Sequence, residues 1–395
     1  MKKLLAGMTH NGRVITFTEP FWAIPFNLFT VYAVLYMMDL GLTEREIGLI
    51  QTVLIITQIV SSIFSGKLTD YLGSKKTTII FDSISWAGAC IVWAFSSSFL
   101  GFAIAAFLNG INKIVFVSFT HLISYNTKPS ERLSNYTGMH IMVILGGFFA
   151  PLGGYIVNKL GLIPGMRGIY LFSGITMLTM FLIRNAMFKE PESHPEREHF
   201  SIVKGVKDSL KYFFSTSKLK RVFTLQAIAQ FYGAFKPIFY FAFLRDSAGL
   251  TSFQLSIVPV VMSIITFLIM VLYVPKVIDE PKALTLGFFA GAISLCLLTL
   301  SATSSIIFIL PAIALDALST AIINPVISSF WITNLDEKRS TTQLGTGFFL
   351  FSLISVPAGI LAAELYNKMP VLPFFAASGF LLLSGVISYT LRARK

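Results

Sequence analysis

The segment Gly66-Lys67-Leu68-Thr69-Asp70-Tyr71-Leu72-Gly73-Ser74-Lys75-Lys76 is a short charged stretch between two long apolar ones, residues 47–65 and 77–95. Each apolar stretch is close to the roughly 20 residues that an α-helix needs to cross a bilayer core. A connection this short joins antiparallel neighbouring helices. We expect Gly66 and Gly73 to bound a turn, because glycine lets the backbone reverse. We expect Asp70 to pair with the lysines or to cap a helix N-terminus.

The composition of the whole chain is that of a membrane protein. Of its 395 residues 54% are hydrophobic and 13% are charged, and the mean hydropathy is +0.74. Soluble domains are about 25% charged, so this chain is solvated mainly by lipid. The net charge of +12 then indicates contact with an anionic membrane surface and no nucleic acid. The two cysteines lie far apart in apolar stretches and predict neither a disulfide nor a metal site, and we expect no cofactor.

The apolar stretches predict twelve transmembrane helices, each long enough to cross with some tilt. They cover residues 14–38, 47–66, 77–96, 99–124, 135–158, 168–188, 220–244, 254–274, 283–302, 304–331, 341–364 and 370–391.

The loop charges predict the orientation. With Lys113 and Lys236 left out because they lie inside spans, 24 Lys and Arg fall on the side of the termini and 5 on the other side. The positive-inside rule therefore places both termini and the central segment in the cytoplasm. Outer loops that are short and lack a glycosylation sequon favour a bacterial inner membrane.

The central segment divides the chain into three parts. Residues 189–219 form a polar linker followed by an amphipathic helix at 201–214, which we expect on the inner leaflet. On either side lie a six-helix bundle at residues 1–188 and a second at 220–395.

The two halves repeat short patterns at offsets of 206 to 209 residues. The matches are Gly41-Leu42-Thr43 with Gly249-Leu250-Thr251, Lys67-x-x-Asp70 with Lys276-x-x-Asp279, Glu131-Arg132-x-Ser134 with Glu337-Lys338-x-Ser340, and Pro151-x-Gly153 with Pro357-x-Gly359. Their constant order predicts duplicated six-helix halves related by an axis along the membrane normal.

The charged segment resembles the loop between the second and third helices of the major facilitator superfamily, roughly Gly-x-Leu-x-Asp-Arg-x-Gly-Arg-Lys. Gly66, Leu68, Asp70, Gly73 and Lys75 match it, whereas Tyr71 and Ser74 stand where the family has arginine. The resemblance covers essentially the whole chain. It implies an all-α membrane protein with twelve transmembrane helices in two pseudo-symmetric six-helix bundles. It also implies that the loop, with Gly66, Asp70, Gly73, Lys75 and Lys76, gates the transport cycle.

In that family the first helix of each three-helix unit lines the central cavity. The corresponding spans here carry Glu19, Lys113, Lys236 and Asp316. A buried unpaired charge is costly in hydrocarbon, so these groups should face a wet cavity or one another. They either form ion pairs that only hold the halves together, or act in transport.

In the transport interpretation Lys113 and Lys236 bind an anionic or zwitterionic group, and Glu19 or Asp316 carries the coupling proton. Polar and aromatic side chains on the same spans complete the predicted substrate site. They are Trp22, Asn27, Asn109, Asn112, Gln226, Gln230, Tyr232 and Asn324.

Span 5 contains Gly146-Gly147-Phe148-Phe149-Ala150-Pro151-Leu152-Gly153-Gly154. This segment looks like a loosened form of a motif found in the superfamily's drug–proton antiporters. Close helix packing by small residues explains it equally well. The arginine that those antiporters carry in span 4 is absent, and Lys113 is the basic residue there.

Asp82 and Arg184 lie near predicted span ends, where we expect them to snorkel or to pair with loop residues. No ATP-binding loop, nucleophile motif or metal-ligand set appears in the sequence, so we expect neither an ATP-driven pump nor an enzyme.

These observations together predict a monomeric secondary transporter in the lipid bilayer. It works by alternating access, in which the two halves rock around a central site, and its partners are a small-molecule substrate and protons. Proton-coupled export of an amphiphilic metabolite or drug is the first interpretation. The alternatives are proton-coupled or facilitated uptake of an organic anion or zwitterion, and a transporter-like sensor that moves nothing.

Overall fold

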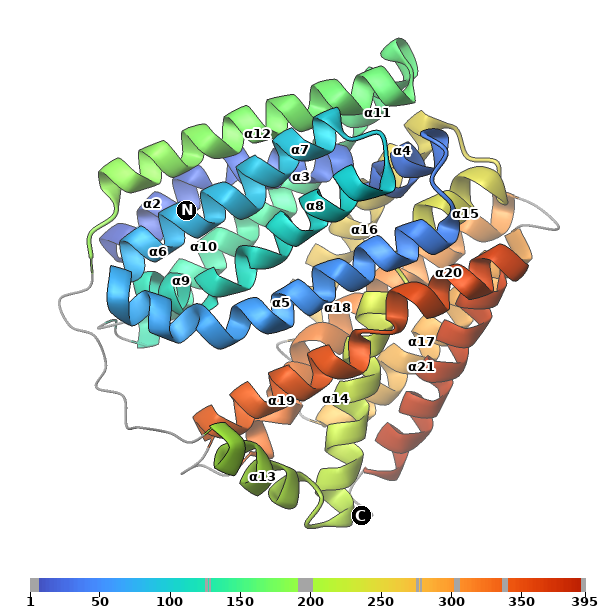
Figure 1. The fold of residues 1–395 in the computed structure, drawn as a ribbon. Helices are drawn as coiled ribbons and strands as arrows, with labels where there is room; N and C mark the ends of the chain where they lie inside the picture. The colour runs from blue at the N-terminus through green and yellow to red at the C-terminus, as the bar shows by residue number, and fades with distance from the viewer. Residues whose placement is uncertain are drawn as a thin grey trace. The chain divides into compact units, whose positions relative to one another are not determined.

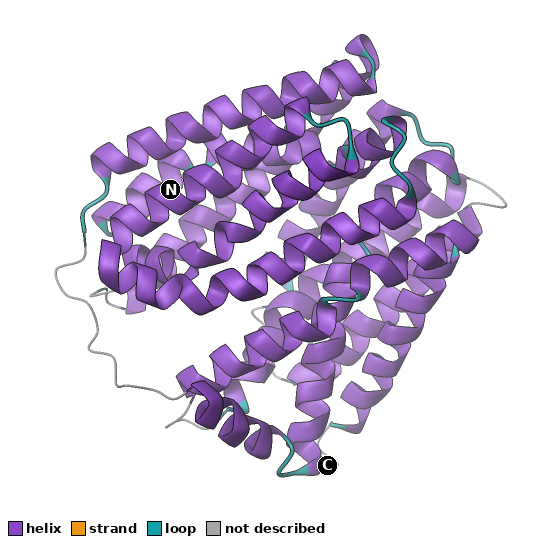
Figure 2. Cartoon of the chain, viewed as in Figure 1, coloured by secondary structure: helices purple, strands orange, loops and turns teal. Residues whose placement is uncertain are grey.

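The computed structural model describes residues 7–124, 127, 129–190, 202–274, 277, 279–301, 306–335 and 340–391. Within these ranges the chain is helical and contains no strand (Figure 2). Ten of these helices are long and apolar enough to cross a membrane, and twelve spans result if each of two bent helix pairs counts as one. Hydrocarbon offers the backbone no hydrogen-bond partner, and a helix satisfies its backbone internally. The predicted all-α membrane fold is confirmed.

The chain divides into two compact units, residues 1–196 with 251–260, and residues 197–250 with 261–395. The first unit contains α2 (His10–Thr18), α3 (Pro20–Thr30), α4 (Ala33–Asp39), α5 (Glu44–Leu72), α6 (Ser74–Asp82), the π-helical turn η1 (Ser83–Gly88), α7 (Ala89–Phe95), α8 (Phe99–Gly110), the 3₁₀ turn η2 (Ile111–Ile114), α9 (Val115–Ser124), α10 (Pro129–Gly147), α11 (Ala150–Leu160) and α12 (Leu162–Met187) (Figure 1).

The remaining helices belong to the second unit, except that the first residues of α16 group with the first unit. They are α13 (Ile202–Phe213), α14 (Ser217–Phe235), α15 (Tyr240–Asp246), α16 (Ser252–Leu272), α17 (Glu280–Ser301), η4 (Ile306–Phe308), α18 (Ile309–Thr333), α19 (Ser340–Ser355), α20 (Ala358–Lys368) and α21 (Leu372–Thr390) (Figure 1).

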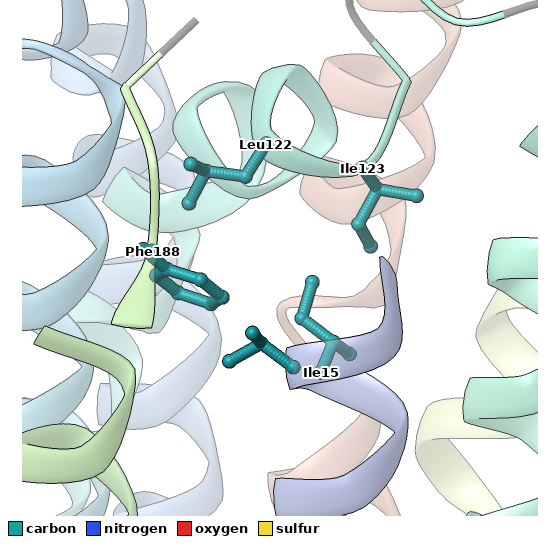
Figure 3. Packing of buried hydrophobic residues seen from close by; sticks show 5 residues of the cluster. Ile15, Leu122, Ile123 and Phe188 are labelled. Carbon is teal, nitrogen blue, oxygen red and sulfur yellow. The ribbon is translucent and has the colours of Figure 1, made fainter. Parts of the chain in front are cut away.

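An apolar cluster ties three distant segments of the first unit together. Figure 3 shows Ile15 of α2, Leu122 and Ile123 of α9, and Phe188 just after α12. Val14 of α2 belongs to the same cluster. All five side chains are buried. The cluster fixes α2 against α9 and the end of α12, and thereby positions the residues that follow α2.

The predicted internal repeat is visible in local structure. Gly41 and Gly249, which follow the first and seventh spans, both have positive φ, +89° and +73°. Each is followed two positions later by a helix-capping threonine, Thr43 or Thr251, whose hydroxyl accepts a hydrogen bond from the backbone N–H three residues on. The repeated Gly-Leu-Thr pattern therefore forms the same local structure twice, a left-handed glycine followed by a threonine helix cap.

The turn between the second and third spans is shorter than the sequence predicts. The helix α5 continues through Gly66 and Asp70 to Leu72, and α6 begins at Ser74. The chain reverses at Gly73 alone, whose φ is +84°. The expected turn bounded by Gly66 was wrong because one glycine in the left-handed region is sufficient to end α5 and start α6.

The N-terminus of α6 is capped by a residue from the far end of the first unit. The Glu190 carboxylate accepts hydrogen bonds from the backbone N–H groups of Ser74, at 2.5 Å, and Lys75, at 2.8 Å. A carboxylate is the preferred partner of these orphan amides and of the positive end of the helix dipole. The cap expected from Asp70 is thus supplied by Glu190.

Three of the four spans that carry the predicted charges are interrupted, and α18, which carries Asp316, is continuous from Ile309 to Thr333. The first bends by 43° between α3 and α4, and the seventh by 46° between α14 and α15, where Pro237 cannot donate a helical hydrogen bond. The fourth passes through the 3₁₀ turn Ile111–Ile114, and the third through the π-helical turn Ser83–Gly88. Breaks of this kind occur often at functional sites because they redirect side chains.

The predicted amphipathic helix is α13, and its C-terminal end packs on protein. Phe213 is buried, with its ring centroid 5.4 Å from that of Phe223 and 5.1 Å from that of Trp331. The Tyr212 hydroxyl donates to the Asn334 carbonyl at 3.2 Å. The expectation that the apolar face lies on lipid is therefore wrong at Phe213. The linker at 191–201 lies outside the described residues.

Candidate functional site

A cavity of about 370 Å³ lies within the first unit. Its size falls in the range of small-molecule sites. Two acids, two bases and a majority of aromatic and apolar side chains line it. The lining residues are Glu19, Trp22, Asp82, Trp86, Asn112, Lys113, Val115, Phe116, Phe119, Thr120, Tyr136, Met139, Met180, Phe181 and Arg184.

One acid and one base of the cavity form a buried ion pair. Glu19 occupies the break between α2 and α3, directly before Pro20, and Arg184 lies in the last turn of α12. The Arg184 guanidinium donates to Glu19 Oε2 at 2.7 Å and, through Nε, to Thr18 Oγ1 at 2.8 Å. The Glu19 side chain is 10% exposed and the Arg184 side chain 4%. Arg184 therefore does not snorkel to a surface as the sequence suggested.

The second acid, Asp82, is buried and differently placed. It ends α6, where the π-helical turn begins, and the residue is 8% exposed. Its carboxylate has neither a hydrogen bond nor an ion pair with any described residue, and the charges that act on it are those of Arg184 and Glu19. The expectation that Asp82 snorkels or pairs with loop residues at a span end was wrong, because the residue is buried and lines the cavity, and an acid inside an apolar span was the signal for this.

Trp22, Asn112 and Lys113 line the same cavity, as the predicted substrate site requires. Trp22 stacks on Phe26, with a centroid distance of 4.7 Å, and its ring meets Trp86 edge-on at 5.3 Å. The Nε1 atom of Trp22 and the Oδ1 atom of Asn112 are buried without a hydrogen-bond partner. A donor and an acceptor in these states leave hydrogen-bonding capacity for a bound molecule.

Two other predicted substrate residues bind backbone. Asn27 donates to the Ala23 carbonyl one turn earlier, at 2.7 Å, and Asn109 donates to the Ser85 carbonyl at 3.0 Å. The Asn109 bond satisfies a carbonyl in the π-helical turn, where the regular ladder is interrupted. The structure thus gives both amides a role in holding helices, and neither lines the cavity.

The second unit holds its own buried ion pair. Lys236, at the break after α14, donates to Asp316 Oδ2 on α18, and the side chains are 11% and 1% exposed. The Lys236 ammonium also lies 4.5 Å from the centroid of the Tyr240 ring. The other carboxylate oxygen, Asp316 Oδ1, is buried without a partner, as is the Tyr232 hydroxyl.

The remaining predicted substrate residues are spread along α14 and α18. Gln226 Oε1 is buried without a partner, whereas Gln230 and Asn324 are exposed. In the described part of the chain, no group of three His, Cys, Asp or Glu side chains could hold a metal ion.

Bent and broken apolar helices, with ionisable groups buried inside them, define a helical membrane transporter. The comparisons with known proteins identify the family. A sequence model of the Major Facilitator Superfamily matches residues 21–359, and the chain belongs to this superfamily. It is therefore a secondary transporter that works by alternating access, and its relatives are transporters rather than enzymes.

Two relatives illustrate the range of similarity. An uncharacterized MFS-type transporter of Methanocaldococcus jannaschii, MJ1560, is 23% identical over 371 residues, which cover 90% of this chain and 91% of the relative. The quinolone resistance protein NorA of Staphylococcus aureus is 24% identical over 159 residues, 40% of this chain and 39% of NorA.

Solved structures show the same fold at low identity. The nucleoside transporter NupG superimposes with a TM-score of 0.73 at 12% identity, over 97% of this chain and 98% of NupG. The human organic anion transporter MFSD10 gives a TM-score of 0.66 at 16% identity, over 96% of this chain and all of MFSD10. These similarities confirm the predicted twelve-helix fold of the superfamily.

Proposed function

We propose that the protein exports a small amphiphilic metabolite or drug in exchange for protons. The observation that carries this proposal is that each unit buries an ion pair with one member at a helix break: Glu19 with Arg184 in the first unit and Lys236 with Asp316 in the second. Purely structural ion pairs are a poor source of stability, because desolvation offsets most of their attraction. Their presence inside a transporter favours a role in coupling.

The coupling follows from the chemistry of each pair. A proton on Asp316 removes the charge that holds Lys236, and the lysine becomes available to the substrate or to another acid. A proton on Glu19 does the same for Arg184. Proton uptake and substrate binding are thereby linked, because both change the partners of the same bases.

The proposed substrate contacts are Lys113, Lys236, Trp22, Asn112, Gln226, Gln230, Tyr232 and Asn324, whereas Asn27 and Asn109 are left out because they donate to backbone carbonyls. Trp22, Asn112 and Lys113 are supported most strongly, because they line one cavity. The segment with Gly66, Asp70, Gly73, Lys75 and Lys76 would hold one closed state, and the Glu190 cap gives it a fixed contact.

Export is favoured over uptake by the aromatic lining of the cavity and by the name of one relative, a quinolone resistance protein. Resistance to an aromatic compound is what moving such a compound outward provides. We propose that both termini lie in the cytoplasm, which the loop charges support, and that the membrane is a bacterial inner membrane, which the short outer loops without a glycosylation sequon support.

The second candidate is uptake of an organic anion or zwitterion. The observation that favours it is the Lys236–Asp316 pair, because a proton on Asp316 would release a buried ammonium for an anionic group. A sensor that moves nothing is the third candidate.

Proteoliposomes with an imposed pH gradient test these candidates. Flux of an aromatic solute against its gradient, driven by inward protons, is expected for wild type and strongly reduced in Glu19→Gln or Asp316→Asn. The matched control is Asp246→Asn, which removes an acid from the exposed Arg245–Asp246 pair. Unchanged pH coupling in both test variants would exclude the proposal. Solute uptake in the direction of the protons would favour the second candidate, and absence of flux the sensor.

A further inference from the structure

Asp82 presents a buried carboxylate that nothing in the described protein neutralises by contact. The cavity's other acid, Glu19, is bound by Arg184 at 2.7 Å, and the same guanidinium donates to Thr18. Asp82 has no such partner. A buried carboxylate without a hydrogen bond or counter-ion is costly, and it either takes up a proton or binds a cation.

The hydrogen-bonding groups of the cavity indicate what it binds. Two carboxylate oxygens of Asp82 and Oδ1 of Asn112 are acceptors without a donor, whereas Nε1 of Trp22 is one donor without an acceptor. A complementary molecule therefore offers several N–H donors and one acceptor. An ammonium group has three donors and a positive charge, and it suits the carboxylate best.

The walls of the cavity indicate the rest of the molecule. Trp22, Trp86, Phe116, Phe119 and Phe181 line it. Aromatic faces bind flat rings, and they attract cations as well. The volume of about 370 Å³ accommodates a fused two-ring molecule with a short side chain.

The charges around Asp82 determine how such a cation can enter. Glu19, Lys113, Tyr136 and Arg184 are the other titratable or charged groups that line the cavity. The helices α5 and α9 also pack against α6, and their titratable residues Asp70 and His121 do not line the cavity. With Asp82 ionised, two acids balance two bases. A proton on Asp82, or a monovalent cation beside the ionised carboxylate, gives the same total charge, so the exchange of one for the other leaves the cavity charge unchanged.

We propose that the cavity of the first unit binds an aromatic amine, with the ammonium group on the Asp82 carboxylate in exchange for a proton. The carboxylic acid releases its proton to water as the protonated amine arrives. The inference rests on the proposed proton-coupled export, and it names both the substrate class and the exchanging group. The fifteen lining residues all belong to one unit, so this unit alone selects the cation.

Three probes with one indole ring test the proposal on the purified full-length protein by titration calorimetry. They are tryptamine, a cation; tryptophol, its neutral alcohol; and indoleacetate, an anion. We expect tryptamine to bind about 10- to 100-fold more tightly than tryptophol, the effect of one charge-assisted contact in a buried site. In Asp82→Asn this preference should disappear.

Proton release gives a readout that a merely structural aspartate would not change. Measured in buffers of different ionisation enthalpy, tryptamine binding should release up to about one proton at acidic pH, falling towards none at alkaline pH. Asp82→Asn should abolish the release, Asp82→Glu should retain it, and Glu44→Gln, an acid at the start of α5 outside the cavity, should leave it unchanged.

Several results would overturn the inference. Equal binding of tryptamine and tryptophol in wild type would do so even if Asp82→Asn fails to fold, and so would tightest binding of indoleacetate or proton release that persists in Asp82→Asn. Proton-driven flux of another solute without tryptamine binding would refute this inference and leave the proposed function standing. Tryptamine binding with proton release in a protein that shows no flux would refute the proposed function and leave this inference standing.

Discussion

Removal of the Asp316 carboxylate is the sharpest test of the charge geometry in the second unit. In Asp316→Asn the Lys236 ammonium stays in a site where its side chain is 11% exposed, without its counter-ion. Breaking a buried ion pair in this way costs about 3–5 kcal/mol. The ring of Tyr240, 4.5 Å from the ammonium, retains about 0.5–2 kcal/mol of attraction. We therefore expect a net loss of about 1–4.5 kcal/mol.

Replacement of both partners should cost far less than replacement of one. Lys236→Met with Asp316→Leu removes both charges and keeps apolar volume, a change that is often neutral or stabilising. On the scale of soluble domains of 150–250 residues, where 1 kcal/mol corresponds to about 2–4 °C, the single variant should lower Tm by about 2–18 °C. The double variant should recover most of that loss.

The assay follows the second unit alone. Trp331 is the one tryptophan of the four in the sequence that lies in this unit, and it is buried among Phe213, Phe223 and Phe351. Fluorine NMR of fluorotryptophan-labelled protein during heating reports its environment separately from the other three. Asp246→Asn is the control, because its pair is exposed and worth at most about 1 kcal/mol. The burial argument would be refuted if Asp316→Asn unfolded at the same temperature as the control Asp246→Asn, or if the double variant were the least stable of the three.

The helix caps and turns give further predictions. Glu190→Ala should destabilise the start of α6 by about 0.5–2 kcal/mol and speed hydrogen exchange at its first amides. Unchanged exchange would show that water caps α6 as effectively as the Glu190 carboxylate does. Gly73→Ala should destabilise the protein more than Glu190→Ala does, because the new Cβ lies 3.1 Å from the Glu190 carboxylate and alanine is strained at positive φ. A thermal-shift measurement on the two variants compares their stabilities. Gly41→Ala and Gly249→Ala should each lower Tm, because alanine at a positive φ costs about 1–2 kcal/mol. The control Gly233→Ala, in a helix with open space around the glycine, should not lower Tm. Equal Tm for all three variants would contradict the repeated left-handed turns.

The class of the protein and its internal symmetry could be predicted from the chain alone. Long apolar stretches predict the spans, because only a helix satisfies its backbone in lipid. The repeated Gly-Leu-Thr pattern predicts equivalent turns, because left-handed glycine and threonine caps are local chemistry. The same reasoning placed Glu19, Lys113, Lys236 and Asp316 among the residues of interest.

The partners of those residues were decided only by tertiary structure. In an almost uniformly apolar helix the sequence does not show which face points inward, so Arg184 and Asp82 looked like residues at span ends. The break before Pro20 brings Glu19 to Arg184, and the π-helical turn after Asp82 directs that carboxylate into the cavity. Helix rotation and local breaks depend on packing against distant segments, and a linear pattern does not record them.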